Sequence, residues 1–358
     1  MLYCDSVGAC VKRRAASRFT VAAAAVLLLA AHPPSGAEAA GSVSTVAPRP
    51  MAMGGAFLGV EDEVAAMAWN PAALTVAQCS RGLNLRVHAN VLGAPAVLGE
   101  TGVLRGVHTE PYGSLPGAEK LVVAAGSLFK AVTASRGGIT VGLLLLEEQL
   151  DPEILAESKG LSDASHLLDG YYSSLTLVFR PASTVSLGAS ATVLTAWDDI
   201  GERLYGAARA YGALLHPNDR VTVGLTYFDF SPGFGYYRRA IEGIAPRTMN
   251  AGITYRAGDL LLLTADLRDL AERHPCTALE PRVGAELNLW GRAALRAGAF
   301  REDGEGPFVV TFGVGSIPMP ACWRGRETPG TDTFVLNYGA LVRGGVAPRH
   351  LLSVDLRF

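Results

Sequence analysis

Stretches in which apolar and polar residues alternate dominate the chain from residue 81 to its last residue. The clearest stretch ends the chain, with apolar side chains at Leu352, Val354, Leu356 and Phe358 and polar ones at Ser353, Asp355 and Arg357. A period of two puts successive side chains on opposite faces of a β-strand. Each stretch therefore predicts a strand with one apolar and one polar face, and the chain as a whole predicts an all-β fold.

The predicted strands are long for a soluble protein. About 14 can be counted, over residues 81–91, 119–129, 137–147, 170–180, 184–196, 203–215, 220–229, 247–256, 259–268, 280–289, 292–300, 307–316, 332–342 and 349–358. Most contain 9–12 residues, the length that a tilted strand needs to cross a bilayer, whereas strands of globular proteins average about 5–6. After residue 31 no apolar run approaches the roughly 18 residues of a spanning helix. If this chain spans a membrane, a closed barrel is the form that remains.

The connections between the predicted strands fall into two sets. Those at 181–183, 216–219, 257–258 and 291 are short, whereas those at 92–118, 148–169, 230–246 and 269–279 are long. Short turns at one end and long loops at the other are typical of outer-membrane barrels. We therefore predict a transmembrane antiparallel β-barrel of about 14 strands with both chain ends on the periplasmic side. Two connections, 130–136 and 317–331, fit this pattern less well, and a soluble β-sandwich or β-solenoid is the alternative.

The N-terminal residues have the pattern of an export signal. Basic residues at Lys12, Arg13, Arg14 and Arg18 precede an apolar run over 19–31 that is too short to span a bilayer. The small residues of Ala37-Glu38-Ala39 then predict cleavage before Ala40. We expect a signal peptide over 1–39, an N-terminal hatch over 40–78 and the barrel over 79–358. A short anchor helix or an amphipathic targeting segment is the alternative for the first part.

A compact, glycine-rich segment, Arg49–Leu74, separates this signal from the first predicted strand. Gly54-Gly55 permits positive φ or close backbone approach. Asp62 is placed to cap a short helix, and Pro71 takes Asn70 out of helical geometry. A small, mildly apolar segment in this place predicts a plug, or hatch, inside the lumen of the barrel. It is either a hatch that shifts when ligand binds or a static filling.

Three blocks of this segment, Arg49–Phe57, Asp62–Trp69 and Asn70–Ala73, resemble a known family. They are similar to the N-terminal hatch of FadL-like long-chain fatty-acid transporters, and closer still to PorV-like relatives and uncharacterised spirochaetal outer-membrane proteins. Motifs of the C-terminal half, such as Arg282–Glu286 and Ala294–Gly298, are common to many barrels. The resemblance implies a plugged barrel in the cell outer membrane. Ligand would enter from outside, occupy apolar lumen sites and leave sideways near a kinked strand.

The resemblance also implies which hatch residues matter for ligand and which partners the chain has. The hatch candidates are Met53, Gly54, Gly55, Phe57, Asn70, Pro71 and Ala72. The implied partners are outer-membrane lipid, a hydrophobic small-molecule ligand and the outer-membrane assembly machinery, for which the C-terminal Phe358 resembles an insertion signal. The net charge of −2 gives no general attraction to nucleic acid.

Polar residues on the inward faces of the strands form a second set of candidates: Asn84, Arg86, His88, Asp266, Arg268, Arg282, Glu286, Arg292, Arg296, Asp355 and Arg357. Arginine forks suit a ligand carboxylate. The lumen residues that we single out for such a site are Arg86, His88, Arg282, Glu286 and Arg296. The alternative is a lattice in which these charges pair with one another and anchor the plug.

No catalytic motif, phosphate-binding loop or metal-ligand spacing stands out in the sequence. We therefore expect no enzyme activity, no cofactor and no metal. The predicted function is passive uptake of long-chain fatty acids or other hydrophobic molecules. The alternatives are a PorV-like partner in secretion or surface attachment and a structural or adhesive surface barrel. Cys79 and Cys322 are both expected on the periplasmic side, where a disulfide between them is conceivable.

Overall fold

The computed structural model describes residues 41–43, 46–62, 64–74, 83–90, 125, 128–148, 171–197, 203–229, 247–270, 279–289, 293–301, 308–316, 334–343 and 348–357. By its internal contacts the chain divides into residues 1–40, which lie outside this description, and residues 41–358. Among the described residues, no helix combines the length and the apolar character that crossing a membrane requires.

Most of the described chain is strand. The elements are, in order, β1 Gly41–Val43, α2 Pro48–Ala52, α3 Ala66–Trp69, the 3-10 helix η1 Pro71–Ala73, β2 Asn84–Asn90, β3 Phe129–Arg136, β4 Ile139–Glu148, β5 Tyr171–Ala182, β6 Val185–Trp197, β7 Arg203–Asn218, β8 Val221–Asp229, β9 Arg247–Ala257, β10 Leu261–Arg268, β11 Glu280–Leu289, β12 Ala293–Arg301, β13 Phe308–Ser316, β14 Phe334–Arg343 and β15 Arg349–Arg357.

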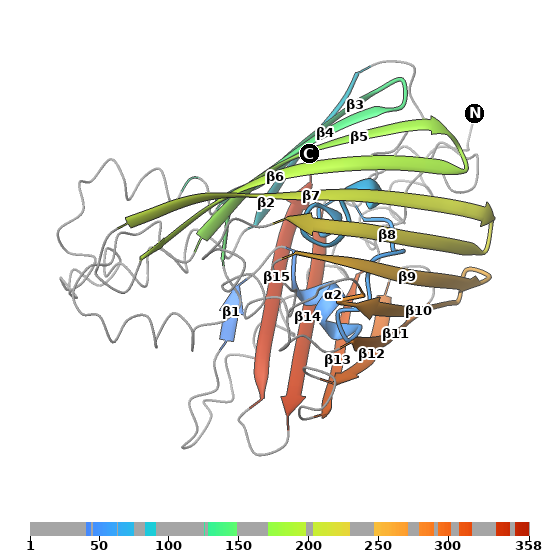
Figure 1. The fold of residues 1–358 in the computed structure, drawn as a ribbon. Coiled ribbons are helices and arrows are strands. Elements are labelled where there is room, and N and C mark those ends of the chain that lie inside the picture. Colours follow the sequence, from blue (N-terminus) through green and yellow to red (C-terminus); the bar gives the residue numbers. More distant parts are fainter. Residues whose placement is uncertain are drawn as a thin grey trace, which may run out of the picture. The chain divides into compact units, whose positions relative to one another are not determined.

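Strands β2 to β15 form one closed sheet. Each pairs antiparallel with the next along the chain, and β15 pairs antiparallel with β2. With β1 set aside, the 15-stranded sheet is therefore a closed barrel of 14 strands (Figure 1). β1 pairs parallel with β15, Gly41 opposite His350. The predicted all-β antiparallel barrel of about 14 strands, with a small N-terminal helical segment, is confirmed.

The second predicted strand is wrong. We expect it over 119–129, but β3 runs over Phe129–Arg136. Gly137 and Gly138, with φ of 58° and 86°, join β3 directly to β4, as in tight hairpin turns that need positive φ. The buried side chains of β3 include the small residues Ala131, Thr133 and Ser135, so its apolar–polar contrast is weak. Residues 130–136, predicted as a connection, are the strand itself.

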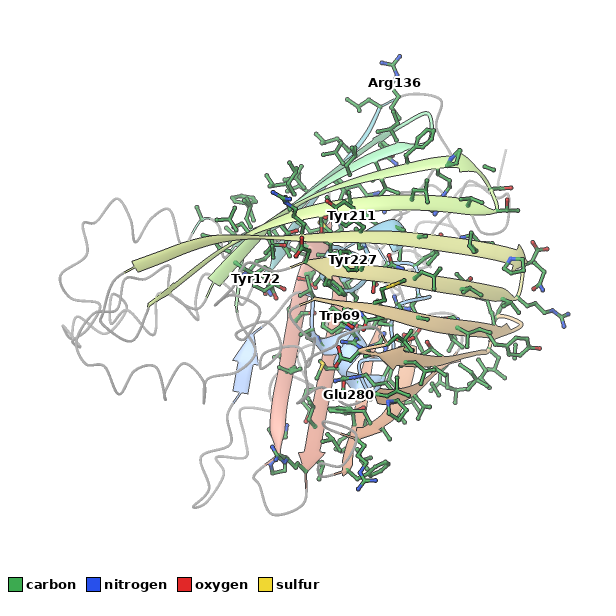
Figure 2. The ribbon with its side chains drawn as sticks, in the orientation of Figure 1. Trp69, Arg136, Tyr172, Tyr211, Tyr227 and Glu280 are labelled. Carbon is green, nitrogen blue, oxygen red and sulfur yellow. The ribbon has the colours of Figure 1, made fainter. Side chains whose placement is uncertain are left out.

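The outer face of the barrel is apolar and the inner face is polar. In β10, Leu263 is 42% exposed, whereas Thr264 and Asp266 are buried. The labelled Tyr211 and Tyr227 belong to the outer face, where their rings stack at 24° (Figure 2). This is the reverse of a soluble sandwich, whose apolar side chains face inward. Strands that alternate in this way are those of a barrel with a lipid-facing surface.

The two ends of the barrel differ in their connections. At one end, which we call the short-turn end, strands are joined by turns at 137–138, 183–184, 219–220 and 258–260. At the other, the long-loop end, the connections include 149–170 and 230–246. The predicted asymmetry is thus present in the sheet order. The connection 317–333 is the exception, because it is long and joins β13 to β14 at the short-turn end.

The N-terminal segment Val46–Leu74, here called the lumen segment, lies inside the barrel. Its helix α2 packs against β12 to β15, while η1 packs against β5 to β7 on another part of the wall. In Figure 1 the blue segment lies between β7 to β10 and the red strands β14 and β15. Phe57 and Trp69, the largest apolar side chains of the segment, are at most 1% exposed.

Nine lumen-facing glycines receive this segment, and we call them the glycine belt. They are Gly142, Gly188, Gly212, Gly224, Gly252, Gly284, Gly298, Gly313 and Gly339, one on each of nine barrel strands. Eight of them form four pairs in direct cross-strand register: 188 with 212, 224 with 252, 284 with 298, and 313 with 339. At every belt position an added Cβ would collide with the lumen segment or with the wall residue beside it. The wall thus meets the segment at backbone distance, the use that strand-interior glycine serves.

The tightest fit can be tested with two glycines of similar conformation. Gly54 of the segment has φ of 66°, and a Cβ there would lie 2.6 Å from the Val283 carbonyl oxygen and 2.7 Å from the Ala299 nitrogen. Gly137 has φ of 58° and nothing within 4 Å. Gly137→Ala should cost only the left-handed penalty, about 1–2 kcal/mol. Gly54→Ala should cost about 3 kcal/mol or more because the clash adds to that penalty.

Urea titration of the folded protein in detergent, read by heat-modifiable mobility on gels, gives both free energies of unfolding. Equal losses in the two variants would mean that the segment does not hold this close contact with β11 and β12.

Candidate functional site: the contact between lumen segment and barrel wall

The Gly54-Gly55 turn is bound by side chains of the wall through its backbone. The Gly54 nitrogen donates to Thr311 Oγ1 at 2.9 Å, and its carbonyl accepts from Arg282 Nη1 at 3.3 Å. The Gly55 carbonyl accepts from Arg268 Nη2 at 2.7 Å. Both glycines have φ of 66°, which turns these backbone groups outward toward β10, β11 and β13. The wall therefore binds the turn through backbone groups whose direction depends on positive φ, a conformation that only glycine adopts without penalty.

Asp266 on β10 holds the next turn of the segment. Its Oδ2 accepts from the backbone nitrogens of Phe57 at 2.7 Å and Leu58 at 3.1 Å. The Phe57 ring meets Trp69 edge to face, with centroids 6.4 Å apart and planes at 76°. Trp69 Nε1 in turn donates to the Gly55 carbonyl at 3.3 Å. Phe57 and Trp69 thus join the two halves of the segment, and the buried indole N–H has a partner.

The Asn70-Pro71-Ala72 turn has the geometry expected from its sequence. Asn70 is extended, with φ of −145°, and its Oδ1 accepts from the Ala72 nitrogen at 3.0 Å, which caps η1. Its Nδ2 donates to the Leu58 carbonyl at 2.7 Å. Ser186 of β6 donates to the Ala72 carbonyl at 2.7 Å. Asn70 therefore uses both ends of its amide to fix one turn of the segment against another.

Arg49 links the segment to the charges of the wall. Its Nε and Nη2 donate to the two oxygens of Glu286 at 2.9 and 2.8 Å, and its Nη1 donates to Asp62 at 2.6 Å. Glu286 also accepts from Arg296 Nε at 2.7 Å, and Arg296 donates to Asn337 at 2.9 Å. Burial lowers the pKa of Arg49, but Glu286 and Asp62 raise it more, so its pKa lies above the ordinary value. The guanidinium stays charged and bidentate.

Asp62 serves two purposes within the segment. One oxygen bonds Arg49, and Oδ1 accepts from the backbone nitrogens of Val64 and Ala65, both at 2.9 Å, in the turn that leads into α3. Asp62 does not cap α3 itself, contrary to the prediction from the sequence, because the N-cap residue is Ala65 and α3 has no side-chain capping bond. The same carboxylate orients Arg49 and fixes the turn that precedes the helix with Trp69.

The sequence-predicted lumen residues separate into two places. Arg282, Glu286 and Arg296 lie together on β11 and β12, and Arg282 also pairs with Glu280 at 2.6 Å. Arg86 and His88 lie on β2 at the seam with β15, His88 fully buried. The structure therefore does not bring all five to one point. Arg292, Phe358, Cys79 and Cys322 lie outside the described residues.

Several contact residues were not singled out from the sequence as candidates. Thr311 and Ser186 bond the segment's backbone, and Arg180 of β5 pairs with Glu61 at 2.7 Å near the short-turn end. Threonine and serine on the polar face of a strand carry no distinctive signal. The glycine belt does carry one, because its members stand inside long strands on the lumen-facing side of the alternation.

The third barrel strand, β4, is irregular just beyond the belt. Leu144 pairs with Ser174, and Glu147 pairs with Tyr172. Between these pairs β4 has two residues where β5 has one, which is a β-bulge. Leu146 in this bulge has φ of 45°, rare for a leucine. Lys130 donates to the Leu146 carbonyl and lies 3.5 Å from Glu147. Glu147 also accepts from the Val46 nitrogen of the lumen segment at 3.3 Å.

Fold and contacts together define a closed antiparallel barrel whose lumen holds its own N-terminal segment. No family model and no curated protein matches the sequence. Among solved structures, the toluene transporter TbuX of Ralstonia pickettii is 15% identical, with 87% of this chain and 96% of that chain covered and a TM-score of 0.43. Two mutants of a porin from Rh. blastica are each 14% identical, with 64% of this chain and 75% of that chain covered and a TM-score of 0.34.

Among the residues that the structure describes, no three His, Cys, Asp or Glu side chains gather to bind a metal ion.

The Arg49 contact can be compared with the Arg180 contact. Arg49→Met removes two buried ion pairs, with Asp62 and Glu286, and should destabilise the folded barrel by about 3–5 kcal/mol. Arg180→Met removes a more exposed pair with the same segment, whose side chains are 16% and 12% exposed, and should cost about 1 kcal/mol. Urea unfolding in detergent measures both. A loss for Arg49→Met no larger than that for Arg180→Met would contradict a buried network centred on Arg49.

Proposed function

We propose that this chain is an exported protein of the cell outer membrane that passes hydrophobic molecules, long-chain fatty acids among them, without energy input or catalysis. In this proposal residues 1–39 are the signal peptide and residues 40–78 the hatch. The ligand enters at the long-loop end, occupies the lumen above the segment and leaves sideways through the wall.

The surface supports the membrane part of this proposal. Every strand from β2 to β14 carries at least one large apolar side chain that is exposed, Leu85 on β2 at 58% and Leu175 on β5 at 52% among them. An apolar surface that encircles a barrel is far larger than the patches that soluble proteins expose. In lipid this surface is favourable, and the closed ladder leaves no unpaired strand edge.

One observation carries the sideways route: the lumen segment fills the barrel at the glycine belt, and β4 bulges directly beyond it. Gly142 of the belt contacts the segment's Met67 and Leu74, and the bulge begins two residues further on, at Leu144. A straight path through the lumen would have to pass close contact between segment and wall on nine strands, on six of which backbone atoms of the segment meet the glycine. A path through the wall meets an already interrupted ladder.

The lining near the bulge favours an apolar cargo. Ala131, Leu144 and Tyr172 are buried on the lumen side of β3, β4 and β5 and belong to one apolar cluster with the segment. Tyr172 is labelled in Figure 2. A sideways exit opens into hydrocarbon, where a polar solute loses its hydration without replacement. Such a route therefore selects hydrophobic molecules by the environment into which it leads.

A second candidate function is that of a PorV-like partner protein. The charge network around Arg49, Glu286 and Arg296 favours it, because this part of the lumen is occupied by the chain's own ion pairs. A barrel used only as a docking platform needs no open path. The two candidates differ in whether purified protein moves lipid by itself.

The proposal predicts a specific pair of permeabilities. Vesicles that contain the folded chain should take up a fluorescent long-chain fatty acid faster than protein-free vesicles. Their ion conductance should stay near the lipid background, because the segment closes the lumen. Stopped-flow fluorescence and planar-bilayer recording measure the two. Porin-like conductance without faster fatty-acid transfer would overturn the proposal. If neither the conductance nor the fatty-acid transfer rises above the lipid background, the result favours the partner-protein function.

The proposed sideways exit at the β4 bulge can be tested with two neighbouring leucines, one facing the lumen and the other facing outward. Leu144 is fully buried on the lumen side of β4, whereas Leu143 is 36% exposed on the outer face. Leu144→Phe should slow fatty-acid transfer by about tenfold, because overpacking at the bulge costs about 1–3 kcal/mol. Leu143→Phe adds the same volume outside and should transfer at the wild-type rate. Equal rates for both variants would place the exit elsewhere.

A further inference from the structure

The elements that flank the lumen segment, β1 before it and β2 after it, begin at opposite ends of the barrel. β1 lies beside His350–Leu352 at the start of β15, which is the long-loop end. After the segment, β2 begins at Asn84 opposite Ser135, next to the Gly137–Gly138 turn of the short-turn end. A segment inserted into a finished barrel would therefore have to thread its first residues through the whole lumen.

The segment and the wall fit each other closely. Met53, Phe57, Leu58 and Trp69 are buried inside the barrel, and an added methyl group at any belt position would collide with the segment in its final place or with the adjacent wall. Each part of the segment is thus fitted to one place on the wall. A close-packed interior of this kind yields little to a chain that slides through it.

The seam of the barrel is its weakest ladder among the described residues. β15 and β2 share three register pairs, Asp355–Arg357 with His88–Asn90, whereas β6 and β7 share thirteen. The segment contacts strands on either side of this seam. α2 contacts β15, and the Val46 nitrogen bonds Glu147 on β4, two strands beyond β2. It thus bridges the part of the wall that contains the shortest ladder.

We propose that the lumen segment docks on the still-open sheet and templates barrel closure, so that β15 meets β2 around a segment already in place. The segment is then a built-in closure device, whatever the barrel later transports. α2 contacts β12 to β15, η1 contacts β5 to β7, and the glycine belt is the part of the wall that fits the segment. The closed state is reached only when both halves of the sheet contact the same segment.

The order of events is testable in the full chain. In a variant that keeps Trp69 as its single tryptophan, with Trp197, Trp290 and Trp323 changed to Phe, Trp69 fluorescence reports docking of the segment. The heat-resistant mobility of the folded form reports closure. During refolding from urea into detergent, the Trp69 signal should reach its native value before or together with closure. Closure that precedes the Trp69 change would overturn the proposal.

A second variant keeps the test decisive if the single-tryptophan chain fails to fold. Thr311→Val removes the hydroxyl that accepts from the Gly54 nitrogen with little change in shape. If docking precedes closure, the loss appears in the closing rate, which falls by about tenfold. Val310→Ala trims the outer face of the same strand and should close within about twofold of wild type. A wild-type closing rate for Thr311→Val, with faster opening alone, would refute templated closure.

Discussion

Backbone-to-backbone contact between the lumen segment and the glycine belt is the constraint on which the rest of this structure depends. Nine strands give up a side chain at the positions that meet the segment. Glycine inside a strand weakens it by the loss of packing and by added chain entropy. That loss is acceptable here because the segment occupies the volume that side chains would otherwise fill. The barrel and its filling are therefore one core, although only one of them is a sheet.

The polar contacts of the site set orientation more than they add stability. Arg49, Glu286 and Arg296 are nearly fully buried, and taking such charges out of water offsets most of what their attraction contributes. What they provide is geometry. Two guanidinium groups on one carboxylate admit a single arrangement of α2 against β11 and β12. An apolar contact of the same size would allow the helix to slide along the wall.

The sequence predicts the architecture well because alternation survives in almost every strand. The pattern around Leu295 and Arg296, for instance, places these residues on the outer and inner faces where the structure has them. It fails at β3, where Ala131, Thr133 and Ser135 make the inner face too small for contrast, and where two glycines form the turn. A periodicity in hydropathy cannot mark a strand whose two faces differ little.

The site is predicted only in part, for a different reason. The segment and its turns follow from local chemistry, as the amide of Asn70 and the carboxylate of Asp62 illustrate. Other residues of the segment have partners more than a hundred positions away, Ser186 for Ala72 and Glu286 for Arg49, and no local pattern pairs them. Gly284 and Gly298 are visible in motifs that look common to barrels, but their role emerges only when register places them opposite each other.

Under the proposed function either the segment or the wall must move for a molecule to pass, and the two movements break different bonds. Withdrawal of the segment breaks at least seven hydrogen bonds to wall side chains, to Thr311, Arg282, Arg268, Asp266 (two), Ser186 and Glu147. At about 1 kcal/mol net for each bond, the withdrawn state is populated below about one part in 10⁵, before any apolar contact is counted.

Opening at the bulge disturbs a ladder that is already interrupted between Leu144 and Glu147. Among the bonds at the bulge are those of Lys130 and Ser173 to Leu146 and the ion pair of Lys130 with Glu147. A few kcal/mol corresponds to a minor state populated at 0.1–10%, enough for passage on ordinary timescales. Under the proposed function, therefore, the wall is the part that yields and the segment is the fixed surface against which it does so.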